Sequence, residues 1–344
     1  MEASARIVAE VDGRGGTRLV TLRGESPLLL RRTGPRTTDG VVTVHLVGGA
    51  AGPLRGDELR LDIEVGPGAR LDVRSVAASI ALPGRAAAPP SRLTITATVG
   101  SGAMLRWLPE PLIAAAGCHH LTRTDVQVAA GGTLVWRDDL VCGRHGEPSG
   151  DVRTDTTIRY ANKTLYRHEL SVGPSAPGWS EAAVLGTPSR PQAAVLDVTG
   201  RSQAAGLGTP GRLQAAALGT LGRSQAAGLG TPGRSQAAGL GTSATSGAAT
   251  TSSRPPTAAS SSGGALGGGG RAVGSVIFAG TDLPPAGLLG PNAVIMPLAG
   301  PGMLASAVGT DIREVRAALD PLITQAIRAP QPNTEALAAA TSPA

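Results

Sequence analysis

Apolar and polar residues alternate in short runs from residue 5 to residue 172. The clearest run is 58–65, where Leu59, Leu61, Ile63 and Val65 share one face of an extended segment. Gly66-Pro67-Gly68 then turns the chain. Similar runs predict further strands at 41–47, 69–76, 93–99, 124–128, 133–139 and 273–279. Short strands separated by regular glycine and proline turns predict an all-β fold, with little room for crossover helices.

The C-terminal region has a helical pattern instead. Asp311-Ile312-Arg313-Glu314 has the spacing of a capping box, and Ile312, Val315 and Leu319 follow at helical intervals. Asp320-Pro321 resembles a second helix start, with proline at the first helical position. We therefore expect one or two short C-terminal helices, followed by a flexible tail at 331–344.

A tandem repeat of 11 residues separates these two regions, with units that begin at Arg201, Arg212, Arg223 and Arg234. Each unit has two or three glycines and too few large apolar residues to form a helical seam. A tract rich in Thr, Ser, Ala and Gly follows. This composition predicts that 187–270 is a long disordered insert.

The flanks of this insert have the pattern of one domain that is interrupted once. We expect 1–186 and 271–330 to form the N-terminal and C-terminal parts of the same β domain. The cost of closing a loop grows only logarithmically with its length, so the insert need not unfold its host.

Composition restricts the possible partners. Aromatic residues make up only 2% of the chain, so the core must be built from Val, Leu, Ile and Ala. The formal charge is +6, but 187–270 holds six arginines and one aspartate, so the remainder is nearly neutral. We therefore expect no nucleic-acid partner.

The sequence also favours a cytoplasmic protein. Two cysteines are too few for a disulfide framework, and the N-terminus lacks the pattern of a signal peptide. The segment 286–310 carries no charged residue, but Pro291, Pro297 and Pro301 break it into short pieces. We interpret these pieces as buried strands and expect no membrane partner.

No GxGxxG, P-loop, HExxH or GxSxG pattern occurs, so the sequence offers no catalytic signature. The most metal-like cluster is Cys118-His119-His120. On a strand, Cys118 and His120 would share a face, and these two ligand types suit nickel, copper or zinc. The alternative is a surface loop with two solvated imidazoles.

A second polar cluster covers 138–147 and contains Asp139, Arg144 and Glu147. A buried acid that faces an arginine is held ionised, so this cluster could line a polar passage or bind a partner. The alternative is an ordinary salt-bridged turn. Asp57, after Gly56, is either a further buried acid or the cap of a turn.

Three segments together resemble the UreD (UreH) family of urease accessory proteins. Residues 56–69 resemble its GD…vgpGA segment, 105–113 its W-x-P-x-P-x-I stretch, and 139–147 its GR-x-x-GE segment. The segments occur in the family's order, and the similarity covers about residues 6–186 and resumes near residue 270.

The resemblance implies a β-helix-like stack of short sheets and a cytoplasmic, non-enzymatic scaffold. Such a scaffold binds apo-urease together with UreF and UreG and passes nickel through an internal polar channel. Nickel would be transient, with no permanently bound cofactor. Asp57, Asp139 and Glu147 would then be channel or partner-docking acids, and Arg144 would orient the last two. The alternatives are a β-rich binding protein unrelated to urease, and a hydrolase that uses Asp139 or Glu147 with a histidine.

The predicted disorder of 187–270 can be tested by limited proteolysis of the full chain. We expect cleavage at the repeat arginines well before any cleavage within 1–172, because extended segments fit protease sites. Protection of the repeats would contradict the prediction.

Overall fold

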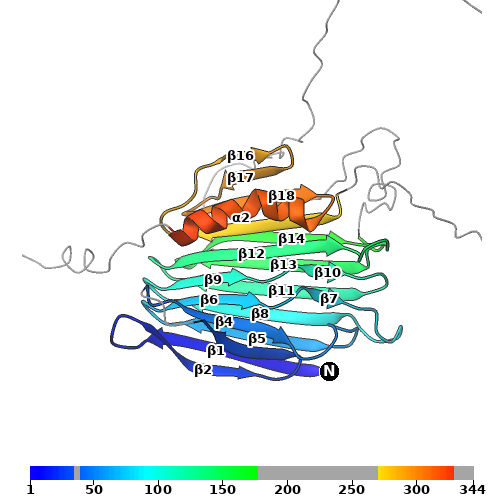
Figure 1. Cartoon of the computed structure of the whole chain (residues 1–344), viewed down its shortest axis with the longest axis horizontal. Helices are drawn as coiled ribbons and strands as arrows, with labels where there is room; N and C mark the ends of the chain where they lie inside the picture. Colours follow the sequence, from blue (N-terminus) through cyan, green and yellow to red (C-terminus); the bar gives the residue numbers. More distant parts are fainter. Residues whose placement is uncertain (35–38, 177–269, 329–344) are drawn as a thin grey trace, which may run out of the picture. The chain divides into compact units, whose positions relative to one another are not determined.

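The chain alternates between two β-sheets, and this alternation organises the structure. The computed structural model describes residues 1–34, 39–176 and 270–328. All of the elements named below belong to one compact unit, to which both sides of residues 177–269 contribute. Figure 1 shows the strands stacked in tiers, with helix α2 (Ile312–Arg328) against the yellow and orange strands.

Sheet A contains seven strands, in the order β14 (Lys163–Val172), β13 (Asp151–Tyr160), β11 (His119–Val128), β8 (Ser91–Val99), β5 (Glu58–Val65), β1 (Glu2–Val11) and β2 (Thr17–Gly24). Sheet B has eleven strands. Its main path runs through β16 (Gly287–Gly290), β17 (Ala293–Pro297), β18 (Gly302–Gly309), β15 (Ala272–Ala279), β12 (Thr133–Cys142), β9 (Met104–Leu108), β6 (Arg70–Ser75), β4 (Val42–Gly48) and β3 (Leu28–Thr33). Two short strands, β10 (Leu112–Ala114) and β7 (Ser79–Ala81), continue beside β12.

Successive coils of the chain each add one strand to each sheet. β5 is followed by β6, β8 by β9, and β11 by β12. As a result, β5, β8, β11 and β13 run parallel in sheet A, and β4, β6, β9 and β12 run parallel in sheet B. This is the winding of a β-helix, so the expected all-β, β-helix-like stack of short sheets is confirmed.

The turns between the sheets stack as regularly as the strands. The amide of Gly100 donates to the carbonyl oxygen of Val65, and the amide of Ala129 donates to that of Val99. A β-carbon on Gly100 would lie 2.7 Å from the backbone nitrogen of Pro67 in the turn of the preceding coil. Glycine is therefore required here because two backbones approach too closely for any side chain.

The core between the sheets is aliphatic, as the composition predicted. Ile7, Leu61 and Ile95 from sheet A meet Leu71 and Leu105 from sheet B, and all five are almost fully buried. Among its few aromatic residues are two stacked tryptophans of sheet B, Trp107 and Trp136, whose ring centroids lie 5.2 Å apart. Such burial of apolar surface is the main favourable contribution to folding.

Helix α2 covers the other face of sheet B through Val315, Leu319, Leu322 and Ile323. It begins as the sequence predicted, because Asp311 Oδ1 accepts the amide of Arg313 at 2.8 Å and caps the first turn.

The second helix start, expected at Asp320-Pro321, is wrong, because α2 continues through Pro321 as one helix. Asp320 does not cap a helix. Its carboxylate accepts a hydrogen bond at 2.6 Å from Arg137 of sheet B, and the apolar face of α2 stays buried on both sides of the proline.

The two flanks of residues 177–269 meet where β15 pairs antiparallel with β12. On its other edge β12 pairs in parallel with β9, so β12 connects the parallel coils to the C-terminal strands. The uncharged segment 286–310 forms the strands β16, β17 and β18, as expected, but the expected burial fails for β16, which is largely exposed. No helix in the described ranges is long and apolar enough to cross a membrane. The predicted insert (187–270, except Gly270) and the whole of the predicted tail (331–344) lie outside the described residues.

The contact between α2 and β15 depends on Gly274. A β-carbon there would collide with Val315 and would lie 2.6 Å from Asp139 Oδ1 and 3.1 Å from Leu319 Cδ1. We predict that Gly274→Ala lowers the free energy of unfolding by about 1–3 kcal/mol, the usual cost of overpacking. Urea denaturation measures this change. Adding Val315→Ala should recover part of the loss, and strictly additive losses would contradict the contact.

Candidate functional site

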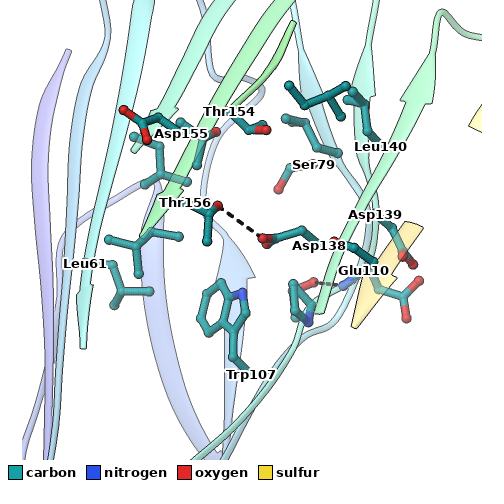
Figure 2. A pocket seen from close by; sticks show the side chains of 18 of the residues that line it. Leu61, Ser79, Trp107, Glu110, Asp138, Asp139, Leu140, Thr154, Asp155 and Thr156 are labelled. Atoms are coloured by element: carbon teal, nitrogen blue, oxygen red, sulfur yellow. Dashed lines mark hydrogen bonds between the residues drawn. The ribbon is translucent and has the colours of Figure 1, made fainter. Parts of the chain in front are cut away.

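A cavity of about 1740 Å³ lies between the two sheets. Leu61, Thr154 and Thr156 line it from sheet A, and Trp107 and Asp138 line it from sheet B. Figure 2 shows that Thr156 and Asp138 point toward each other from opposite sides. The lining is largely apolar and shares Leu61 and Trp107 with the aliphatic core, and Thr154, Thr156 and Asp138 add polar groups to it.

Asp138 is the most unusual of these groups. Its Oδ2 accepts hydrogen bonds from Trp136 Nε1 at 3.1 Å and from Thr156 Oγ1 at 3.5 Å. No salt bridge to Asp138 occurs within the described part of the chain. Burial raises the pKa of this carboxyl from 3.8 to about 6, even though the bond from Trp136 favours the charged form. Asp138 is therefore a half-buried acid that has no salt-bridge partner among the described residues.

Other polar side chains in the cavity are satisfied by neighbours. His120 is almost fully buried, with Nδ1 at 2.9 Å from Ser91 Oγ and Nε2 at 3.0 Å from Thr122 Oγ1. Burial lowers the pKa of His120 to about 4, so its ring is neutral near physiological pH. Burial, and to a smaller extent the charge of Asp138, raises the pKa of Tyr166. Both side chains are therefore uncharged lining groups.

A cluster of ion pairs lies on the opposite face of β12, where α2 packs. Arg137 donates to Asp139 Oδ2 at 2.7 Å and to Asp320 Oδ1 at 2.6 Å. Arg316 donates to Glu110 Oε2 at 2.8 Å, and its Nε lies 3.8 Å from Asp139 Oδ2. Burial raises the pKa of Asp139, while Arg137 acts in the opposite direction. Asp139 and Glu110 also line the cavity, so the cluster reaches the space between the sheets.

Comparison with known proteins identifies the family. The sequence profile described as "UreD urease accessory protein" matches residues 1–238. The chain belongs to the UreD family of urease accessory proteins.

Its relatives cover the chain to different extents. "Urease accessory protein UreD 3" of Streptomyces griseus is 35% identical over 327 residues, which cover 93% of this chain and 95% of that protein. UreD of Parafrankia sp. is 42% identical over 205 residues, covering 54% of this chain and 68% of the relative. UreD of Streptomyces avermitilis is 45% identical over 187 residues, covering 54% and 73%. The resemblance inferred from three short segments is thus confirmed.

The GR-x-x-GE segment of this UreD chain forms a clamped surface turn. Glu147 Oε1 accepts the backbone amide of Arg144 at 2.9 Å and its Nε at 2.7 Å, and the side-chain bonds from Arg144 hold the pKa of Glu147 at about 2. Arg271 Nη2 donates to the carbonyl oxygens of Cys142, Arg144 and Glu147 at 2.8, 3.0 and 2.7 Å. Neither Arg144 nor Glu147 lines the cavity. The salt-bridged turn, which was the alternative interpretation, describes this segment.

The arginine that holds Asp139 is Arg137, and not Arg144 as the sequence suggested. Residues 137 and 139 of β12 point to the same side, so they pair directly, whereas Arg144 lies beyond the end of the strand. Asp57 caps a turn, because its Oδ2 accepts the amide of Leu54 at 2.8 Å. Its Oδ1 accepts the amino group of Met1 at 2.9 Å.

Cys118 and His120 are both buried, but Cys118 precedes strand β11, and only His120 lines the cavity. The Cys118 thiol lies 3.7 Å from the carbonyl oxygen of Asp151, and burial raises its pKa to about 12. Within the described residues, no three or more His, Cys, Asp or Glu side chains are placed to hold a metal ion. In this conformation both ring nitrogens of His120 contact hydroxyls, and the thiol is protonated.

The sequence interpretation included Asp138 in the cluster 138–147 without selecting it as a candidate, and it missed Arg137 and Arg316. For Arg137 a signal existed, because Arg137 and Asp139 are two residues apart on a predicted strand. Asp138 occupies the inward face of that strand, but nothing in the pattern marks a cavity behind it. Arg316 meets Glu110 across 206 residues of chain, a pairing that one sequence does not reveal.

We predict that Asp138→Asn removes part of the pH dependence of stability. Because the folded-state pKa is about 6 and the ordinary value is 3.8, the folded chain holds this proton more tightly than the unfolded chain. The resulting stabilisation is present below the ordinary pKa and is lost as pH rises through about 6. The asparagine oxygen still accepts from Trp136 and cannot ionise. Urea unfolding at about pH 4.5 and about pH 7.5 should therefore show a larger gain over wild type at the higher pH. An equal difference at both pH values would contradict the assignment.

Proposed function

We propose that this UreD protein is a cytoplasmic maturation scaffold that binds apo-urease together with UreF and UreG and assists nickel insertion. Membership of the UreD family supports a role in urease maturation. In this proposal the protein has no catalytic centre, and nickel is its cargo.

The observation that carries the nickel proposal is the half-buried acid Asp138 in the cavity between the sheets, whose carboxyl pKa is raised to about 6 by desolvation. A carboxylate that is desolvated and has no cationic partner gains from any divalent cation that enters. Neighbouring Thr154 and Thr156 add neutral oxygen ligands. Imidazole nitrogen suits nickel better than carboxylate or hydroxyl oxygen does, so these few oxygen ligands would bind it weakly enough to release it.

The Arg144–Glu147 turn supports partner docking. It is exposed at Arg144, yet the bonds to Glu147 and from Arg271 fix its backbone before any partner arrives. A pre-ordered surface loses little entropy on binding. The turn and the capped turn at Asp57 are thus proposed docking elements, separate from the proposed cation path through Asp138 and Asp139.

The two roles can be separated in cells that express urease with its accessory proteins. We predict that Asp138→Ala lowers urease activation and nickel content by about tenfold or more, as removal of a metal-orienting group commonly does. Co-purification with apo-urease should persist. The matched control is Glu64→Gln, an exposed carboxyl on the outer face of sheet A.

If the Arg144–Glu147 turn docks a partner, the double variant Arg144→Ala/Glu147→Ala should differ from Asp138→Ala, because it should impair complex formation. Co-purification with apo-urease or the accessory proteins should weaken, while the urea midpoint of the isolated protein falls by less than that of Gly274→Ala. Normal activation by the Asp138→Ala variant would refute the cation path, and normal complex formation by the double variant would refute the docking role.

A further inference from the structure

Sheet B continues beyond the last strand of sheet A. Sheet A ends with β14, whereas β18, β17 and β16 extend sheet B past β15. Figure 1 shows β17 and β16 beyond the tier of β14. Within the described ranges, no strand of sheet A therefore covers the inner face of these two strands.

The inner face of this extension is apolar, and its exposure increases from strand to strand. Ile277 of β15, Leu304 of β18 and Met296 of β17 are neighbours in one cross-strand row. Ile277 is fully buried, Leu304 is half-buried and Met296 is 39% exposed. Leu288 of β16, on the same face, is 78% exposed. An apolar face that continues beyond the strands able to bury it is typical of a surface that binds another segment.

The backbone of β14 is bonded on one side only. The amide of Asp151 donates to the carbonyl oxygen of Cys118, on the side of β11. Successive residues of a strand direct their backbone groups to opposite sides, so the odd-numbered residues of β13 face β11 and the even-numbered residues face β14. The β14 residues opposite these even-numbered residues are Tyr166, His168, Leu170 and Val172.

The other edge of β14 is open. Arg167, Glu169 and Ser171 direct their amides and carbonyl oxygens away from β13, and no strand in the described part of the chain pairs with them. An open edge of this kind is a template for a further strand. A strand added there would extend sheet A by one tier and would cover the inner face of β18 and β17.

We infer that the open edge of β14 takes up an extended segment of a partner protein by strand addition. The inference rests on the proposed function, in which the protein binds other proteins, and it names one surface for that contact. Main-chain hydrogen bonds to β14 give the affinity, and alternate side chains give the specificity. The side chains on the inner side of the segment are apolar, because they meet Leu304 and Met296.

The outer side of β14 indicates the charge of the segment. Glu169 has an ion pair with Arg153, with 2.7 Å between Arg153 Nη2 and Glu169 Oε2. Arg167 is exposed and has no ion pair among the residues that the structure describes. Opposite charges on facing residues of neighbouring strands stabilise their pairing. The segment therefore carries an acidic residue that faces Arg167.

A second copy of the chain does not fit this edge. Symmetric pairing of two β14 strands requires an antiparallel arrangement about a two-fold axis perpendicular to sheet A. Both inner faces would then lie on the same side, and the strands β18, β17 and β16 of the two copies would occupy the same space. A single extended segment avoids this clash.

Hydrogen exchange at single-residue resolution tests the inference. The full-length protein is measured alone and in its purified complex with apo-urease and the accessory proteins. We expect the amides of Arg167, Glu169 and Ser171 to exchange rapidly in the isolated protein and at least about tenfold more slowly in the complex. The amides of His168 and Leu170 should be protected in both states.

Protection of the three edge amides in the isolated protein would overturn the inference. If that protection were independent of concentration, the edge would be paired within the chain. If it appeared only at high concentration, the occupant would be a second copy.

Proline at an edge position removes the outward donor without breaking a bond to β13. Glu169→Pro should therefore reduce co-purification of the full-length protein with apo-urease and the accessory proteins several-fold. Glu169→Ala is the matched substitution, because it also loses the ion pair with Arg153 but keeps the amide. It should weaken the complex much less than the proline does.

A charge reversal covers the case in which Glu169→Pro does not fold. Arg167→Glu should weaken the complex several-fold, because it would face the acidic residue of the segment. The control is Arg123→Glu, the same reversal at an exposed position of β11, which has a strand on each side. This control should bind as wild type does.

The outcomes separate the inference from the proposed function. A complex in which the β14 amides exchange as in the isolated protein would overturn the inference alone. Equal losses for Glu169→Pro and Glu169→Ala would also overturn it and leave the proposed function intact. Failure of the wild-type protein to form any complex would overturn both.

Discussion

The pairing of β12 with β15 is the interaction on which the rest of this structure depends. It closes a sheet between segments separated by residues 177–269, and β12 is parallel to β9 on its other edge. The inward face of β12 carries Trp136 to the core and Asp138 to the cavity. The outward face carries Arg137 and Asp139 to α2. Because neighbouring strand residues point to opposite faces, one strand links the cavity to the helix.

Arg137 and Asp139 are charged side chains buried where α2 packs on sheet B, and their burial costs free energy. An ion pair under a helix offers little stability compared with apolar packing, since both charges lose their water. Helix α2 already buries an apolar face through Val315 and Leu319, so it does not need Arg316 or Asp320 for attachment. Arg316 instead connects α2 to Glu110 and Asp139, two acids that line the cavity.

Local features of the fold could be predicted from the sequence, but long-range pairings could not. The alternation of apolar and polar residues predicted a strand at 58–65, and β5 covers these residues. Asp311 caps α2, as the capping-box spacing indicated. Both depend on residues that are close in the chain. Asp320-Pro321 failed as a helix start because the apolar face of α2 stays buried across the proline, a tertiary effect. Of the candidate residues, Asp139 reaches the cavity, whereas Arg144 and Glu147 form a turn that nothing in their spacing distinguishes from a channel motif.

The central claim is that both sides of residues 177–269 fold as one cooperative body through β12. Native-state hydrogen exchange of the full chain tests it most directly, because amides that open together share one free energy of opening. The account predicts that the slowest amides of β9, β12 and β15 exchange with the same free energy, equal to that of global unfolding. Slow exchange in β9 with much faster exchange in β15, independent of global stability, would show two separate units and contradict the account.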